Sequence, residues 1–84
     1  MCSNGVNTNQ LKDTIVQIDE TVALTRRWTH RMYHLAKDGS MPKTTEKLEE
    51  VQRMLDDVRA LLDEAGDAVD DDDSNINNVT VELA

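Results

Sequence analysis

Aromatic residues are almost missing from this chain: it has no Phe, one Trp and one Tyr among 84 residues. Any hydrophobic core must therefore be aliphatic, and aliphatic side chains suit the contact stripes of packed helices better than a β-sandwich. Chains of this length also bury too little surface to be comfortably stable alone. We therefore expect a second copy or another protein to supply further contacts.

Cysteine and long apolar runs are also scarce. Cys2 is the single cysteine, which excludes an internal disulfide. No apolar run approaches the roughly 18 residues of a membrane span, and no charged and apolar leader opens the chain. We expect a soluble, cytoplasmic protein with no membrane partner.

Catalytic patterns are missing as well. The three serines, Ser3, Ser40 and Ser74, fall in a predicted arm, turn and tail, and the three glycines form no phosphate-binding loop. The sequence predicts a non-enzyme with no catalytic residues and no cofactor.

Two heptad patterns dominate what is present. Spacings that alternate between three and four residues average 3.5, which keeps one apolar stripe on one side of a helix over many turns. The first stripe consists of Leu11, Ile15, Ile18, Val22, Thr25, Thr29, Met32 and Ala36. The second stripe consists of Leu48, Val51, Leu55, Val58, Leu62, Ala65 and Val69. Both predict helices that pack against other helices.

The helix-ending and helix-starting residues between the stripes predict an all-α, antiparallel two-helix hairpin. Asp38-Gly39 ends the first helix, and Pro42 belongs in the first turn of the second. The predicted organisation is a flexible arm at 1–8, a helix at 9–38, a turn at 39–43, a helix at 44–69 and an acidic disordered tail at 70–84. A short connection between helices of similar length favours antiparallel packing.

Each helix has apolar residues beside its stripe, which makes its apolar face wider than one partner helix can cover. We therefore expect hairpins to pair, most simply as a homodimeric four-helix bundle. The predicted oligomer or partner interface comprises Leu11, Ile15, Ile18, Val22, Leu24, Trp28, Met32, Leu35, Leu48, Val51, Met54, Leu55, Val58, Leu61 and Leu62.

Charge is strongly segregated. The chain has 17 acidic and 9 basic residues, for a net charge of −8, and the acidic excess is greatest near the C-terminus. The end of the first helix is basic, and Arg26, Arg27, His30 and Arg31 are a candidate anion or partner patch. The alternative interpretation is structural, with basic and acidic flanks pairing across a bundle. The overall negative charge argues against a nucleic-acid partner.

Two metal patterns are weak. His30 and His34 are four residues apart and share a helix face, but Arg31 beside them disfavours a cation. Asp71 and Asp73 begin a spacing like that of a calcium loop, but Ile76 stands where that loop needs glycine. We predict no metal site. Apolar residues alternate over 79–83, so a strand that docks on a partner's sheet is one alternative to a frayed end.

These features predict a small helical protein-protein interaction module, such as a regulator, adaptor or chaperone-like subunit, that acts through self-association or packing with another helical protein. An alternative function is an acidic decoy that occupies the nucleic-acid site of another protein. A third is a weak DNA-binding helical dimer that uses the basic stretch of the first helix.

Overall fold

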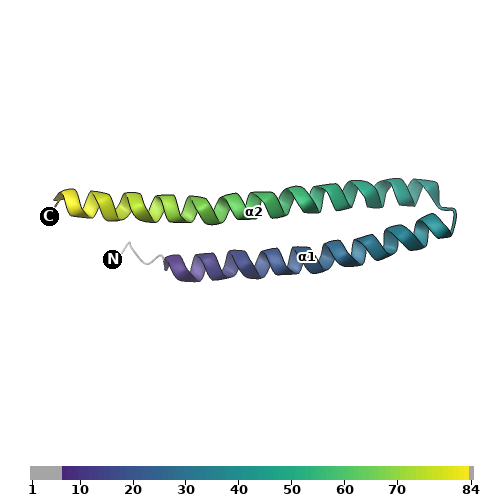
Figure 1. Cartoon of the computed structure of the whole chain (residues 1–84), viewed down its shortest axis with the longest axis horizontal. Coiled ribbons are helices and arrows are strands. Elements are labelled where there is room, and N and C mark those ends of the chain that lie inside the picture. The colour runs from purple at the N-terminus through teal and green to yellow at the C-terminus, as the bar shows by residue number, and fades with distance from the viewer. Residues whose placement is uncertain (1–6, 84) are drawn as a thin grey trace.

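The computed structural model is a hairpin of two long antiparallel helices (Figure 1). It describes residues 7–83, with side chains through Ser74. Helix α1 spans Thr8–Asp38 and helix α2 spans Pro42–Leu83, and the molecule measures 67 × 16 × 14 Å. The two helices lie side by side along the length of α1, and α2 extends beyond the N-terminal end of α1 (Figure 1). The predicted all-helical hairpin is confirmed.

Helix α1 begins slightly earlier than the sequence predicted. The Asn7 side chain accepts a hydrogen bond from the Gln10 backbone N–H at 3.1 Å. Asparagine is a favoured N-cap because its oxygen satisfies one of the free N–H groups of the first turn. Thr8 therefore belongs to the helix and not to the predicted arm. The rest of that arm, residues 1–6, lies outside the described residues.

The turn between the helices is a Schellman arrangement, which satisfies the last carbonyls of α1. The Met41 N–H donates to the Ala36 carbonyl at 2.9 Å, and the Ser40 N–H donates to the Lys37 carbonyl at 3.2 Å. Ser40 occupies the left-handed position, with φ of 58°. Gly39 has φ of −83°, but a Cβ there would lie 3.1 Å from the Leu35 carbonyl oxygen. Gly39 is thus favoured by close packing and not by a left-handed backbone.

Helix α2 continues through Leu83, whereas the sequence predicted a helix end near Val69 and a disordered tail at 70–84. Two contacts with α1 extend the pairing into the acidic run. Asp70 accepts a hydrogen bond from Lys12 at 2.8 Å, and Asp73 accepts one from Thr8 at 3.1 Å. These partners offset the repulsion that favours disorder in an isolated aspartate run. The segment 79–83 is helical in its backbone, and its side chains lie outside those that the structure describes.

The contact between the helices uses half of each predicted stripe. Every seventh residue faces the other helix and is buried or half-buried: Ile15, Val22, Thr29 and Ala36 from α1, and Leu48, Leu55, Leu62 and Val69 from α2. The remaining large members of the two stripes are exposed, including Ile18 and Val58. The line of contact is displaced toward residues that follow those contact positions by four, such as Asp19, Arg26 and Gln52, which are half-buried or buried. The residues on the other side of each predicted stripe therefore stay exposed.

Charged and polar side chains complete this line of contact. In α1, Lys12, Asp19 and Arg26 recur every seven residues along one edge of the contact. They pair with Asp70, Arg59 and Asp56, respectively. The nitrogen to oxygen distances are 2.8, 3.0 and 3.1 Å, respectively. The hairpin is therefore held by apolar layers that alternate with cross-helix ion pairs.

Candidate partner-binding surface

The side of the hairpin opposite the ion pairs is apolar. Of the twelve exposed large hydrophobic side chains in the described part of the chain, ten, each between 40% and 72% exposed, form what we term the open apolar face, and Val16 and Met41 lie outside it. Its members are Leu11, Ile18, Leu24, Trp28, Met32 and Leu35 from α1, and Val51, Met54, Val58 and Leu61 from α2. All ten belong to the interface that the sequence predicted.

Helix geometry places nine of these residues on one side of the molecule. Leu24 lies at the outer rim of that side, because it follows the contact residue Val22 by two and is rotated by about 200° from it, as Arg31 is from Thr29. A residue four positions later on a helix is rotated by about 40° in one sense, and a residue four positions earlier by about 40° in the other. Asp19 and Arg59 each follow a contact residue by four. They meet on the edge of the hairpin that carries the three cross-helix ion pairs, which we term the charged edge. Ile18 and Val51 each precede a contact residue by four. They therefore lie at the opposite edge, beyond the line of contact.

The remaining predicted interface residues lie between the two helices. Ile15, Val22, Leu48, Leu55 and Leu62 are half-buried within the hairpin. The structure thus separates the predicted interface into two groups, one that joins α1 to α2 and one that is open.

The hairpin by itself has almost no core. Among the described residues, Ala36 is the one hydrophobic residue classed as buried, and no large side chain is fully buried. The accessible surface is 6617 Å². A compact protein of 9.5 kDa would expose about 5,000 Å². The difference, about 1,600 Å², exceeds the ~800 Å² that each partner buries in an interface of standard size.

The predicted basic patch is divided between two sides of α1. Arg26 turns to the charged edge, where its guanidinium donates to Asp56 at 3.1 and 3.4 Å. His30 also turns toward α2, with its Nδ1 3.0 Å from the Gln52 side-chain oxygen. Arg31 lies instead over the Trp28 ring, 5.0 Å from the ring centroid, beside the open apolar face. The patch is therefore not one anion site in the free hairpin.

The two histidines do lie together. His30 Nε2 and His34 Nε2 are 3.0 Å apart, so one ring donates a hydrogen bond to the other. Gln52 accepts from His30 Nδ1, which leaves the Nε2 of His30 as the acceptor. Among the described residues, no group of three or more His, Cys, Asp or Glu side chains is arranged to hold a metal ion.

Two ion pairs change the titration of their basic members. The hydrogen bond and the charge of Asp70 raise the pKa of Lys12 above its ordinary value. The hydrogen bond and the charge of Asp19 likewise raise the pKa of Arg59. Both basic groups are solvent-accessible, so each pair adds little to the free energy of unfolding.

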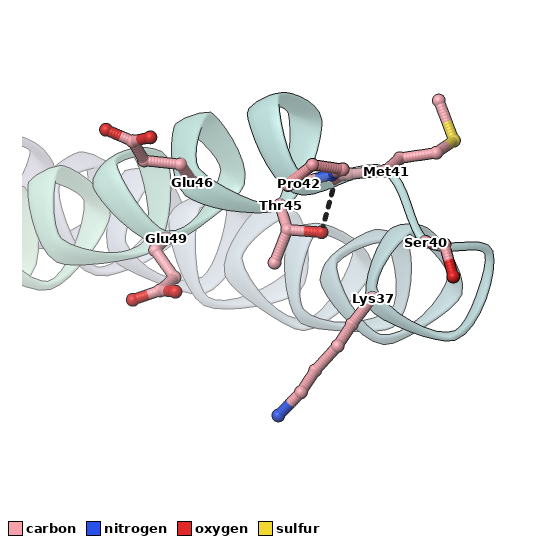
Figure 2. A pocket seen from close by; sticks show the side chains of 7 residues that line it. All are labelled: Lys37, Ser40, Met41, Pro42, Thr45, Glu46 and Glu49. Carbon is pink, nitrogen blue, oxygen red and sulfur yellow. Dashed lines mark hydrogen bonds between the residues drawn. The ribbon is translucent and has the colours of Figure 1, made fainter.

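A shallow hollow of about 540 Å³ lies at the turn. Figure 2 shows that Lys37, Glu46 and Met41 around it point away from one another. The Thr45 hydroxyl is used internally, since it donates to the Met41 carbonyl at 2.8 Å. The hollow therefore offers no set of convergent polar groups that would fix a small ligand.

The sequence suggested that basic and acidic flanks pair across a bundle, but it did not identify the pairs. Gln52, which is 8% exposed, was not predicted to lie inside, and Asp19 and Arg59 were not predicted to meet. A signal was present for one of the ion pairs, because Asp19 and Arg59 follow the stripe residues Ile15 and Leu55 by four. Reading it required the register of one helix against the other, which the turn determines.

The chain matches no known protein family, no curated protein and no solved structure. Within the described part of the chain, neither helix has a stretch both long and apolar enough to cross a bilayer. Among the features of the described residues, the open apolar face is the one that points to a function.

Proposed function

We propose that this chain is a protein-protein interaction module whose open apolar face binds the helices of a partner. The supporting observation is the exposure of ten large hydrophobic side chains on one side of a hairpin that has almost no core. Monomeric proteins rarely leave so continuous an apolar surface in water, and such surfaces mark binding sites. A helical partner suits it because the exposed residues recur at helical spacing.

The ion pairs weigh against the decoy function. Asp19, Asp56 and Asp70 are engaged with basic residues of the same chain, so their charges are partly neutralised. A surface that imitates phosphates needs carboxylates that are free to meet a partner's cations. The interaction module is for this reason our first choice, and regulator or adaptor roles both fit it.

Val58→Asp tests the proposal, with Ala60→Asp as the matched control. Both residues lie on α2 and both are exposed in the hairpin, but Ala60 lies away from the open apolar face. A carboxylate buried without a partner weakens an interface by about 3 kcal/mol or more, or at least ~100-fold in affinity. Solution mass and retention of partners from the native cell are the measurements. We expect assembly to be lost in Val58→Asp and kept in Ala60→Asp.

The choice of residue matters. Leu55 and Leu62 are half-buried between α1 and α2, so an aspartate at either position disrupts the hairpin itself. Circular dichroism should show that Val58→Asp, which leaves the contact between α1 and α2 intact, keeps more helix than Leu55→Asp. Assembly that is the same in Val58→Asp as in the unaltered chain would refute the proposed function.

A further inference from the structure

The side-chain positions of the hairpin are those of one half of a four-helix bundle. In such a bundle, two positions of each heptad point to the centre, and the positions flanking them contact the two neighbouring helices. Here one flank, which includes Asp19 and Arg59, contacts the neighbouring helix of the same chain. The other flank includes Trp28, Met54 and Leu61, each of which is over half exposed. A second hairpin would complete the arrangement.

Two symmetric arrangements of a second copy are possible. In the first, both turns lie at the same end, and α1 of one copy covers α2 of the other. In the second, the turns lie at opposite ends, and each helix covers its own counterpart. Both are two-fold symmetric and both bury the open apolar face. The charges beside that face distinguish them.

The second arrangement brings acidic residues together. Glu50, Asp57 and Glu64 recur every seven residues on α2, next to the open apolar face. When α2 lies antiparallel against α2 of the other copy, Asp57 meets Asp57 and Glu50 meets Glu64. Like charges facing each other across an interface are unfavourable. Lys43 and Lys47 offset this repulsion only near the turn.

The first arrangement pairs opposite charges. The two-fold axis of this arrangement runs along the bundle, so it does not change the height of any residue. A residue of α1 therefore lies level with the same α2 residues in the other copy as in its own chain. The numbers of the cross-helix partners add up to 82 for Lys12 and Asp70 and for Arg26 and Asp56, and to 78 for Asp19 and Arg59, so residues whose numbers add up to about 80 are level. Arg31 of one copy is then level with Glu50 of the other, and Asp38 is level with Lys43. Trp28 is level with Met54, a pair that forms favourable sulfur-aromatic contacts.

We propose that the open apolar face is covered by a second copy of this chain, with both turns at the same end and α1 of each copy over α2 of the other. This inference rests on the proposed function and names the partner of the same surface. The evidence for it is that Arg31 and Lys43 of one copy come level with Glu50 and Asp38 of the other, whereas the second arrangement places Asp57 against Asp57 and Glu50 against Glu64.

A distance between spin labels tests the arrangement. Met41 is exposed at the turn and lies outside the open apolar face, so Met41→Cys in a Cys2→Ser background carries one nitroxide per chain. Helix axes in a bundle lie 8–10 Å apart, so turns at the same end place the labels within about 30 Å. Turns at opposite ends place them at least about 45 Å apart, because α1 has 31 residues at ~1.5 Å each.

Charge exchange gives a second measurement on unlabelled protein. Arg31→Glu should weaken the dimer about three- to tenfold, because it places a like charge opposite Glu50 of the other copy. Adding Glu50→Arg should restore the affinity. Glu50 also lies 3.5 Å from Lys47 in its own chain, so Glu50→Arg alone should weaken the dimer as well. Arg27→Glu, on the side of α1 away from the face, is the control and should have no effect.

The outcomes separate this inference from the proposed function. A dimer mass with the short label distance and restoration by the double exchange support it. A dimer with the long distance, or one that the double exchange does not restore, overturns the arrangement and leaves the interaction function in place. A monomer at high micromolar concentration overturns the second copy as the occupant. The proposed function then depends on whether Val58→Asp abolishes partner retention.

Discussion

Asp19 and Arg59 lie forty residues apart in the sequence, yet the Arg59 guanidinium donates two hydrogen bonds to the Asp19 carboxylate, at 3.0 and 3.4 Å. A planar guanidinium and a carboxylate match each other in this two-point geometry. The pair lies near the middle of α1, between the ion pairs of Lys12 and Arg26. Its two-point geometry therefore requires the register that the turn gives to the two helices.

Reversal of this ion pair should show its role. We expect Asp19→Arg and Arg59→Asp each to lower the thermal midpoint by a few degrees, because each places like charges opposite one another. The double variant should regain most of the loss. The effect should shrink in 1 M salt, which screens charges beyond about 3 Å.

Arg27→Asp serves as the control for this reversal, since Arg27 is exposed on the side of α1 away from α2. It changes the net charge by the same amount but should leave the midpoint nearly unchanged. Midpoints that do not recover in the double variant would contradict the pairing.

Stability should fall at alkaline pH in part through Lys12. Asp70 raises the pKa of Lys12 in the folded hairpin above its unfolded value. The contribution of the pair is therefore complete below the unfolded pKa of about 10.4 and is lost as the pH rises through the folded pKa. Thermal midpoints between pH 7 and pH 12 are the measurement.

Lys12→Arg isolates this contribution, because a guanidinium stays charged throughout the range. We expect the midpoint of the variant to decline less than that of the unaltered chain above about pH 10. Parallel declines in the two proteins would show that the Lys12–Asp70 pair does not contribute.

The turn should become more stable when glycine replaces Ser40. Ser40 has φ of 58°, a left-handed conformation that costs a side-chain-bearing residue about 1–2 kcal/mol. Glycine adopts it freely but loses more entropy on folding, so Ser40→Gly should stabilise the hairpin by about 0.5–1 kcal/mol. Urea unfolding followed by circular dichroism measures the difference.

Gly39→Ala should have the opposite effect. Its Cβ would lie 3.1 Å from the Leu35 carbonyl oxygen, which belongs to the backbone and cannot move aside easily. If Gly39→Ala were the stabilising change and Ser40→Gly the destabilising one, the assignment of the two turn positions would be wrong.

Much of the architecture followed from spacing alone. Leu48 to Val69 and Leu11 to Ala36 repeat at 3.5 residues, and Gly39 and Pro42 stand between them, which is enough to predict an antiparallel hairpin. The residues of the open apolar face come from those repeats and from the apolar residues beside them, and their role as an interface remains a prediction. The repeats could be read from the sequence because helical periodicity is a local property, which each helix has before it meets the other.

The division of that interface was decided by tertiary structure. Leu55 faces α1 while Val58, three residues later in the same stripe, is 40% exposed. Asp70 belongs to a helix and not to a disordered tail, because Lys12 lies opposite it at 2.8 Å. The sequence by itself determined that each helix has a wide apolar stripe. Which side of the stripe is buried in the hairpin depends on where the cross-helix ion pairs meet, and those pairs form only when the turn sets the two helices in register.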